Sequence, residues 1–148
     1  MSKVYPRKLI PGIKEVIRNL YNKYTLSLAD NANADIKNVL KDLGVLQYFS
    51  CTDISDDIKI SKPDCKFFQY YLDKLSTEPI ETIFIGDRLD NDIIPAKVLG
   101  IRTIWFKNGI YGILEPKSQS EMSDVIIENA FEILNAVDYI ESSSVYAL

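Results

Sequence analysis

The sequence contains no histidine in 148 residues. This absence excludes histidine general-base catalysis, the catalytic triads and dyads built on histidine, and zinc sites with histidine ligands. Carboxylates, lysines and metal ions remain as possible catalytic groups. Cysteine is scarce as well, because only Cys51 and Cys65 occur. These two lack the spacing of a metal site, and we interpret them as ordinary thiols of a reducing compartment.

Basic clusters and long apolar runs are also missing. The net charge is −4 and no stripe of lysine or arginine occurs, so we expect no nucleic-acid partner. No apolar run reaches the roughly 18 to 20 residues that span a membrane, and the first residues lack a signal-peptide core. These features predict a cytoplasmic protein without a membrane partner. The length and the 47% hydrophobic content predict one domain over residues 1–148.

Short apolar runs alternate with segments of helical periodicity along the sequence. The pattern predicts helices at 13–24, 36–43, 63–75, 93–99 and 130–137, and strands at 25–29, 48–52, 82–85, 101–106 and 125–127, the last at a sheet edge. Residues 53–57 and 109–123 are expected to form loops, and 142–148 to fray. Such alternation is typical of a parallel sheet covered on both faces. The predicted fold is therefore doubly wound α/β, a Rossmann-like three-layer sandwich.

The most informative segment is an apolar run that ends in a cluster of carboxylates, Ile83-Phe84-Ile85-Gly86-Asp87-Arg88-Leu89-Asp90-Asn91-Asp92. Its acids follow the carboxyl end of a predicted strand, where open α/β sheets bind their ligands. Carboxylates so close together favour a hard-cation site. The alternative is a turn with a helix N-cap, in which Asp90 or Asp92 binds backbone amides.

Three further polar positions are expected to meet these acids, because the carboxyl ends of parallel strands lie at one edge of the sheet. A carboxylate pair, Asp87 with Asp92, can hold Mg²⁺. Lys62 can neutralise a phosphate and the charge that develops on its transfer. Amides and side chains at Asp30 and Asn31 can hold the remaining phosphate oxygens.

Simpler interpretations of the same residues stay open. Lys62 taken alone is typical of a solvated loop lysine. Asp30 taken alone is typical of a turn or a helix N-cap, and Asn33 can do the same work for the helix that follows.

The sequence resembles the carboxyl-terminal core of the haloacid dehalogenase-like (HAD) hydrolase superfamily from about residue 11 to residue 134. Residues 24–31 resemble the family's second motif, 62–64 its third and 86–92 its fourth. The resemblance implies a Mg²⁺-dependent hydrolase of small phosphorylated substrates, which forms a covalent phosphoaspartate.

The resemblance also implies roles for individual residues. Asp87 would bind Mg²⁺ directly or nearly so, and Asp92 would support the metal's waters. Lys62, as a catalytic residue, would pair with the nucleophile and the phosphate. Asp30 and Asn31 fall at the phosphate-binding motif.

Two departures from the family pattern bear on activity. The family's nucleophile lies in an Asp-x-Asp motif at the end of a first, central strand, but residues 1–10 contain no acid, and the cap domain is missing too. Asp30 stands where the family generally has threonine or serine, so it would repel a phosphate or turn away as a cap.

We therefore expect a HAD-like core that lacks its usual first central strand and is incomplete or inactive alone. Residues 3–6, a second chain, a homo-oligomer or the rest of a longer protein could fill the strand's place. A non-catalytic HAD-like regulatory or interaction module, a pseudoenzyme, is the alternative. A phosphoacceptor receiver domain fits poorly, because Lys62 precedes Asp87.

Overall fold

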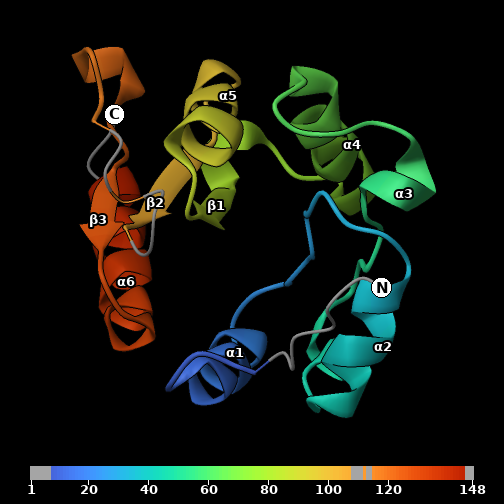
Figure 1. The fold of residues 1–148 in the computed structure, drawn as a ribbon. Coiled ribbons are helices and arrows are strands. Elements are labelled where there is room, and N and C mark those ends of the chain that lie inside the picture. The colour runs from blue at the N-terminus through green and yellow to red at the C-terminus, as the bar shows by residue number, and fades with distance from the viewer. Residues whose placement is uncertain (1–7, 108–111, 113–114, 146–148) are drawn as a thin grey trace.

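Three parallel strands form the sheet of the computed structural model, which describes residues 8–107, 112 and 115–145 (Figure 1). The strands are β1 (Ile83–Gly86), β2 (Arg102–Phe106) and β3 (Val125–Ile127), in the order β1-β2-β3. The three predicted strands in this half of the chain are thereby confirmed to within a residue, as is the edge position of β3.

Helices precede, connect and follow these strands. They are α1 (Ile13–Tyr21), α2 (Asp35–Asp42), α3 (Ser55–Ile58), α4 (Cys65–Leu75), α5 (Ile94–Val98) and α6 (Ile133–Val145). A π-helical turn, Leu89–Ile93, carries the chain from β1 into α5. Within the described residues, no helix combines the length and the apolar character that a membrane crossing requires.

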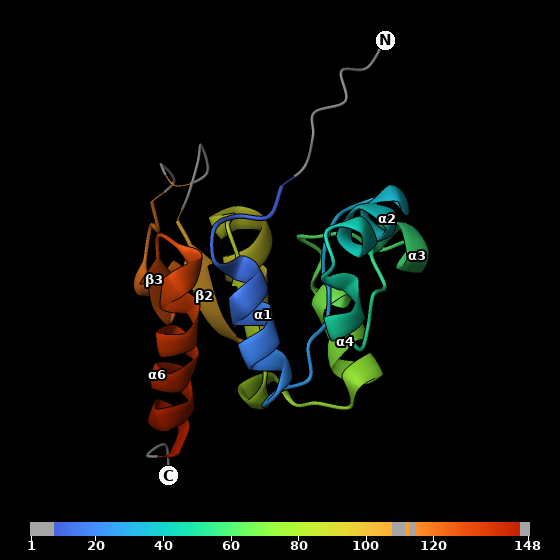
Figure 2. The same ribbon diagram turned by 90° about the horizontal axis from the view of Figure 1, so that it is seen from below.

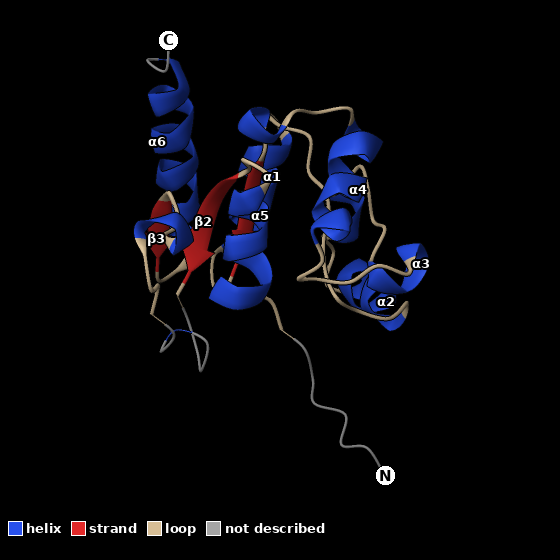
Figure 3. Ribbon diagram, turned by 90° about the horizontal axis from the view of Figure 1, so that it is seen from above, coloured by secondary structure: helices blue, strands red, loops and turns tan. Residues whose placement is uncertain are grey.

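The helices cover both faces of the sheet. On one face, α1 and α6 pack side by side against β2 and β3, with Val16, Ile104 and Val137 in a shared core (Figure 2). On the other face, Phe68 of α4 packs against Phe84 of β1, with ring centroids 5.0 Å apart. This arrangement confirms the predicted Rossmann-like three-layer α/β fold (Figure 3).

The predicted strands at 25–29 and 48–52 are reduced to a single parallel bridge between Ser27 and Cys51. In the described part of the chain, no strand lies between residues 25–29 and β1. A strand is stabilised by neighbours on its edges, so the sequence pattern predicted more sheet than this half-paired segment forms.

Three further expectations differ from the structure. Residues 53–57 are not wholly a loop, because the carboxylate of Asp57 accepts a hydrogen bond from the Ile54 amide at 3.0 Å and closes the turn that begins α3. Pro63 is not the first helical residue. Instead, Asp64 is the N-cap of α4 and accepts a hydrogen bond from the Lys66 amide at 2.9 Å.

Fraying from Ser142 onward is not observed as far as Val145, where α6 ends. The buried Val137 and Ile140 fix this helix on the sheet and support its continuation. Residues 146–148 lie outside the described residues. So does the segment 3–6, which the sequence offered as a substitute for the central strand.

Candidate functional site

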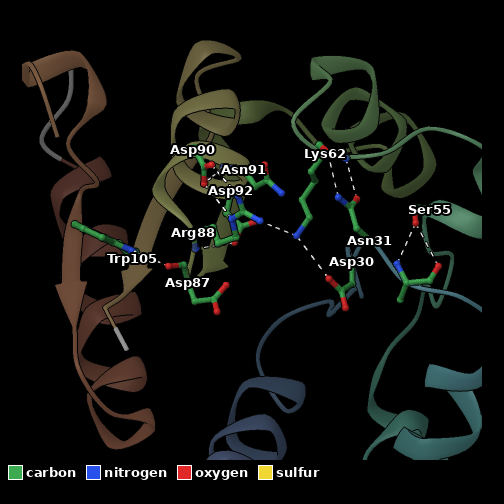
Figure 4. A network of polar contacts seen from close by, with 11 residues as sticks. Asp30, Asn31, Ser55, Lys62, Asp87, Arg88, Asp90, Asn91, Asp92 and Trp105 are labelled. Atoms are coloured by element: carbon green, nitrogen blue, oxygen red, sulfur yellow. Dashed lines mark hydrogen bonds and ion pairs between the residues drawn. The ribbon is translucent and has the colours of Figure 1, made fainter. Parts of the chain in front are cut away.

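Lys62 lies at the carboxyl end of β1, where the loops before α4 and after β1 meet (Figure 4). Its side chain is 10% exposed, and its ammonium nitrogen lies 2.7 Å from Oδ1 of Asp92 and 3.7 Å from Oδ1 of Asp30. Lys62 is therefore a largely buried cation between two carboxylates and not a solvated loop lysine. Three segments that are distant in sequence meet at this nitrogen.

Asp92 is held rigidly by contacts on both carboxylate oxygens. Oδ1 accepts the Lys62 ammonium, and Oδ2 accepts the backbone N–H of Arg88 at 3.0 Å. A β-carbon on Gly86 would lie 2.5 Å from Asp92 atoms, so only glycine permits this approach to the end of β1. Because both oxygens are engaged, Asp92 is suited to position its neighbours.

Asn31 fixes the backbone of the lysine. Its side-chain amide donates to the carbonyl of Lys62 at 3.1 Å, and its Oδ1 accepts the N–H of Lys62 at 2.8 Å. The structure thus gives Asn31 a positioning role, while a contact with phosphate stays a prediction.

Asp30 faces Lys62 and does not act as a helix cap. The side chain of Asn33 accepts the Asp35 amide, the first of α2, at 3.0 Å, while the N-cap residue itself is Ala34. Asp30 remains 57% exposed, so its pairing with Lys62 is the weaker of the two contacts.

Asp87 lies at the end of β1 beside the Lys62–Asp92 pair. The pKa of its carboxyl is raised, first by removal from water and then by the neighbouring charge of Asp92. The residue as a whole is still exposed. The Asp87 carboxyl and the neighbouring Asp92 carboxylate form an oxygen-donor pair whose charge a hard cation would relieve.

Asp90 has a local role instead. Its carboxylate forms two contacts with the guanidinium of Arg88, at 2.7 and 3.1 Å, and accepts the Asn91 amide at 2.9 Å. The hydrogen bonds from Arg88, together with its charge, accordingly lower the pKa of Asp90. Both Asp90 and Asp92 accept a backbone amide, as the turn interpretation expected, but Asp92 is also paired with Lys62.

Two supporting residues were not predicted from the sequence. The indole N–H of Trp105, on β2, donates to the carbonyl of Asp87 at 3.0 Å and fixes that loop. The hydroxyl of Ser55 both accepts from the Ala32 amide and donates to the Ala32 carbonyl, at 3.0 and 3.2 Å. Neither contact has a sequence signal, because each joins segments that only the fold brings together.

Asp87 and Asp92 could supply only some of the ligands of a metal ion, and water would have to supply the others. Across the described residues, no cluster of three or more aspartate, glutamate, cysteine or histidine side chains is arranged to bind an ion. Mg²⁺ commonly binds through one or two carboxylates and keeps several waters, so a site on Asp87 and Asp92 does not require such a cluster. The two metal assignments made from the sequence stay predictions.

A family model described as haloacid dehalogenase-like hydrolase matches residues 3–106 of the chain. A glyceraldehyde 3-phosphate phosphatase from Methanopyrus kandleri is 34% identical over 95 residues, which make up 64% of this chain and 41% of that protein. The protein of the same name from Pyrococcus furiosus is 30% identical over 132 residues, 87% of this chain and 54% of that protein.

A similar solved structure is that of a HAD phosphatase from Thermococcus onnurineus. It has a TM-score of 0.76 and 26% identity, over 88% of this chain and 58% of that chain. The chain thus spans between 41% and 54% of the length of the two curated relatives.

Proposed function

Because the chain belongs to the haloacid dehalogenase-like hydrolase family, we propose that it forms the lysine and magnesium half of a phosphomonoester hydrolase site. The observation that carries this proposal is the position of the Lys62 ammonium, 2.7 Å from Asp92 and beside Asp87 at the carboxyl end of β1. A fixed cation next to an oxygen-donor pair is the arrangement that phosphoryl transfer uses.

Each residue has a distinct part in the proposal. Lys62 neutralises the phosphate and the charge that develops on its oxygens. Asp87 is the residue that would hold Mg²⁺, which supplies further neutralisation of the phosphoryl group when bound. Asp92 orients Lys62 through one oxygen and the Arg88 backbone through the other. Asn31 positions Lys62 by forming two hydrogen bonds with its backbone.

In this proposal, none of the acids around Lys62 is left to act as the carboxylate nucleophile. Residues outside the described ranges contain no aspartate or glutamate. The oxygens of Asp92 are engaged, and Asp30 is paired with Lys62. We therefore propose that a segment outside these 148 residues supplies the nucleophilic aspartate, and that the 148 residues alone are inactive.

The names of similar proteins support a substrate class for the proposed site. Proteins named glyceraldehyde 3-phosphate phosphatase and phosphoserine phosphatase are similar to this chain. These names support a small phosphorylated metabolite as the substrate. Both cysteines are free thiols, which supports action in the reducing environment of the cytoplasm.

The test is turnover of 4-nitrophenyl phosphate with Mg²⁺, measured for the purified chain with and without a peptide that carries an Asp-x-Asp sequence. Turnover is expected only when chain, metal and peptide are combined, and Asp87→Asn should abolish it. Asp90→Asn is the matched control. It should leave turnover unchanged, because the carboxylate of Asp90 is paired with Arg88. Equal turnover in wild type and Asp87→Asn would overturn the proposal.

A non-catalytic HAD-like module is the second candidate. The observation in its favour is Asp30, whose carboxylate shares the Lys62 ammonium that a phosphate would need. Failure of inorganic phosphate and Mg²⁺ to bind, singly or together, with a folded chain would support this candidate over the first.

A further inference from the structure

A polar pocket of about 460 Å³ opens to solvent beside Lys62. It is lined by residues 31–33, 55–56 and 59–61, which belong to the loop before α2, to α3 and to the loop before α4. Volumes of this size are typical of small-molecule sites. The polar pocket is therefore large enough for the part of a small substrate that is not phosphate.

The polar pocket adjoins the position assigned to the phosphate. Asn31 lines the pocket and also forms two hydrogen bonds with the backbone of Lys62, and Ser61 directly precedes this lysine. Figure 4 shows Asn31 and Ser55 on the side of Lys62 that is away from Asp87. A phosphate held by Lys62 and Asp87 would thus have the metal-binding acids on one side and the polar pocket on the other.

Hydrogen bonds and an ion pair hold the walls of the polar pocket together. The Ser55 hydroxyl bonds both backbone groups of Ala32, at 3.0 and 3.2 Å, and the Ser55 amide donates to the carbonyl of Asp30 at 3.0 Å. Lys37 of α2 forms a 2.7 Å ion pair with Asp57 of α3. Because these contacts fix α2 and the loop before it against α3, the pocket is preformed and binding would cost little ordering of the chain.

Uncharged hydrogen-bonding groups are available on both walls. The Oδ1 of Asn33 accepts the Asp35 amide, which leaves the side-chain NH₂ group of Asn33 as a donor, and the Ser61 hydroxyl can both donate and accept. In the part of the chain that the structure describes, neither of these two groups has a protein partner. Ile60 adds a partly buried apolar side chain to the lining. Hydroxyl groups on a short carbon chain match this lining.

The charges at the polar pocket disfavour a second anion. The ammonium of Lys59 lies 3.2 Å from Oδ1 of Asp56, so these two lining residues neutralise each other. Asp30, which directly precedes the lining residue Asn31, adds a carboxylate that is 57% exposed. A ligand with a second anionic group would meet these carboxylates while Lys59 is already paired, and like charges repel.

We propose that the polar pocket binds the leaving group of the substrate and that this leaving group is a small, neutral polyol. The phosphate lies at Lys62, and the hydroxyl groups of the polyol form hydrogen bonds with Asn33 and Ser61. The assignment of the polyol as a leaving group rests on the proposed function, because that function places the phosphate at Lys62. The preference of the pocket for hydroxyl groups does not depend on it.

Titrations of the chain with Mg²⁺ present test the proposal, with calorimetry for affinity and ¹H–¹⁵N NMR spectra for location. The ligands are inorganic phosphate, glycerol 3-phosphate, phosphoglycolate and phosphoethanolamine, of which the last two carry a carboxylate or an ammonium in place of the hydroxyl groups. Glycerol 3-phosphate should bind about tenfold more tightly than inorganic phosphate, because its hydroxyl groups add hydrogen bonds. It should also shift the amide signals of Asn33 and Ser61. Phosphoglycolate should bind no more tightly than inorganic phosphate.

A pair of phenylalanine variants tests the location. Ser61→Phe fills the polar pocket from an exposed position and should reduce the affinity for glycerol 3-phosphate to that for inorganic phosphate. Ser50→Phe is the matched control, because Ser50 is also exposed but does not line the pocket, and the tenfold preference should remain. Should Ser61→Phe fail to fold, Ser61→Ala removes only the hydroxyl and should weaken the binding of glycerol 3-phosphate about threefold or more.

Equal affinities of the wild type for glycerol 3-phosphate and inorganic phosphate, or a preference that survives in Ser61→Phe, would overturn the proposal. Tighter binding of phosphoglycolate or phosphoethanolamine than of glycerol 3-phosphate would also overturn it, because the pocket would then favour a charged group.

Failure of every phosphate compound to bind would contradict the proposed function instead. Erythritol, which carries no phosphate, then tests the polar pocket by itself. It should shift the amide signals of Asn33 and Ser61 with a saturable curve in the wild type and leave them unchanged in Ser61→Phe. No shift in the wild type would overturn the pocket's preference for hydroxyl groups as well.

Discussion

The ammonium of Lys62 and the carboxylate of Asp92 form a 2.7 Å ion pair whose side chains are only 10% and 4% exposed. They come from two loops that are distant in sequence, one before α4 and one after β1, and Asp92 is anchored in turn by the Arg88 amide. A pair so withdrawn from water is expensive to break, because the remaining partner keeps its charge in a poorly hydrated place.

Asp92→Asn should therefore lower the free energy of unfolding by about 3 kcal/mol. The asparagine retains the shape but leaves Lys62 without its close counter-charge. Urea denaturation followed by circular dichroism at pH 7 measures the change. Asp90→Asn removes a pair that is 34% and 54% exposed, so its effect should stay below about 1 kcal/mol. Equal losses in the two variants would contradict the account of this pair.

Gly86→Ala should destabilise the protein by about 1 to 3 kcal/mol, because the new methyl group would lie 2.5 Å from Asp92 and displace it from Lys62. Thermal unfolding measures the effect. Gly112→Ala is the control, since a β-carbon there first meets Lys107 at 3.4 Å, an ordinary contact. A destabilisation as large at Gly112 as at Gly86 would refute the steric explanation.

Asp30→Ser should raise the affinity for inorganic phosphate several-fold, because it removes one of the two carboxylates that share the Lys62 charge. Stability should change little, since Asp30 is 57% exposed. Calorimetric titration with phosphate measures the affinity. Asp42→Ser, which makes the same change at the end of α2, should leave it unaltered. Equally tighter phosphate binding in both variants would show that the change in net charge alone, and not the contact with Lys62, explains the effect.

Asp87 should contribute less to the free energy of unfolding of the metal-free protein at neutral pH than in acid. Its folded-state pKa is raised, so the protonated carboxyl is the favoured form, and its contribution is lost as the pH rises through that pKa. Asp87→Asn mimics the protonated carboxyl and should unfold at a higher temperature than wild type at pH 7. The difference should stay below about 1 kcal/mol because the residue is partly solvated.

At about pH 3, where aspartate is protonated in both the folded and the unfolded chain, the wild type and Asp87→Asn should unfold at the same temperature. Scanning calorimetry in a chelating buffer measures the unfolding temperature of both proteins at each pH. A variant that is less stable than wild type at pH 7 would contradict the assigned direction of the pKa shift.

The sequence predicted those helices and strands whose apolar residues pack against other elements of this chain. The helix at Ile13–Tyr21, the helix that buries Phe67 and Phe68, and the three strands β1 to β3 are of this kind. The strands at 25–29 and 48–52 were over-predicted, because β-structure depends on partners that a local pattern does not reveal.

The site was predictable in outline, because its position depends on the order of strands and loops along the sequence. The rule that the carboxyl ends of parallel strands converge is enough to place Lys62 near Asp92 from the sequence alone. It could not predict that Asp30 would pair with Lys62, that Asn31 would hold the lysine backbone, or that Trp105 would fix Asp87. These contacts depend on side-chain directions that only the packed structure sets.

Trp105 offers the most direct measurement of the central claim, that Asp87 binds Mg²⁺ beside Lys62. It is the only tryptophan in the sequence, and its indole donates to the Asp87 carbonyl at 3.0 Å. Titration with Mg²⁺ should change its fluorescence with a saturable, single-site curve in wild type and Asp90→Asn, and leave it flat in Asp87→Asn. The same curve in Asp87→Asn, or no response in the folded wild type, would contradict the account.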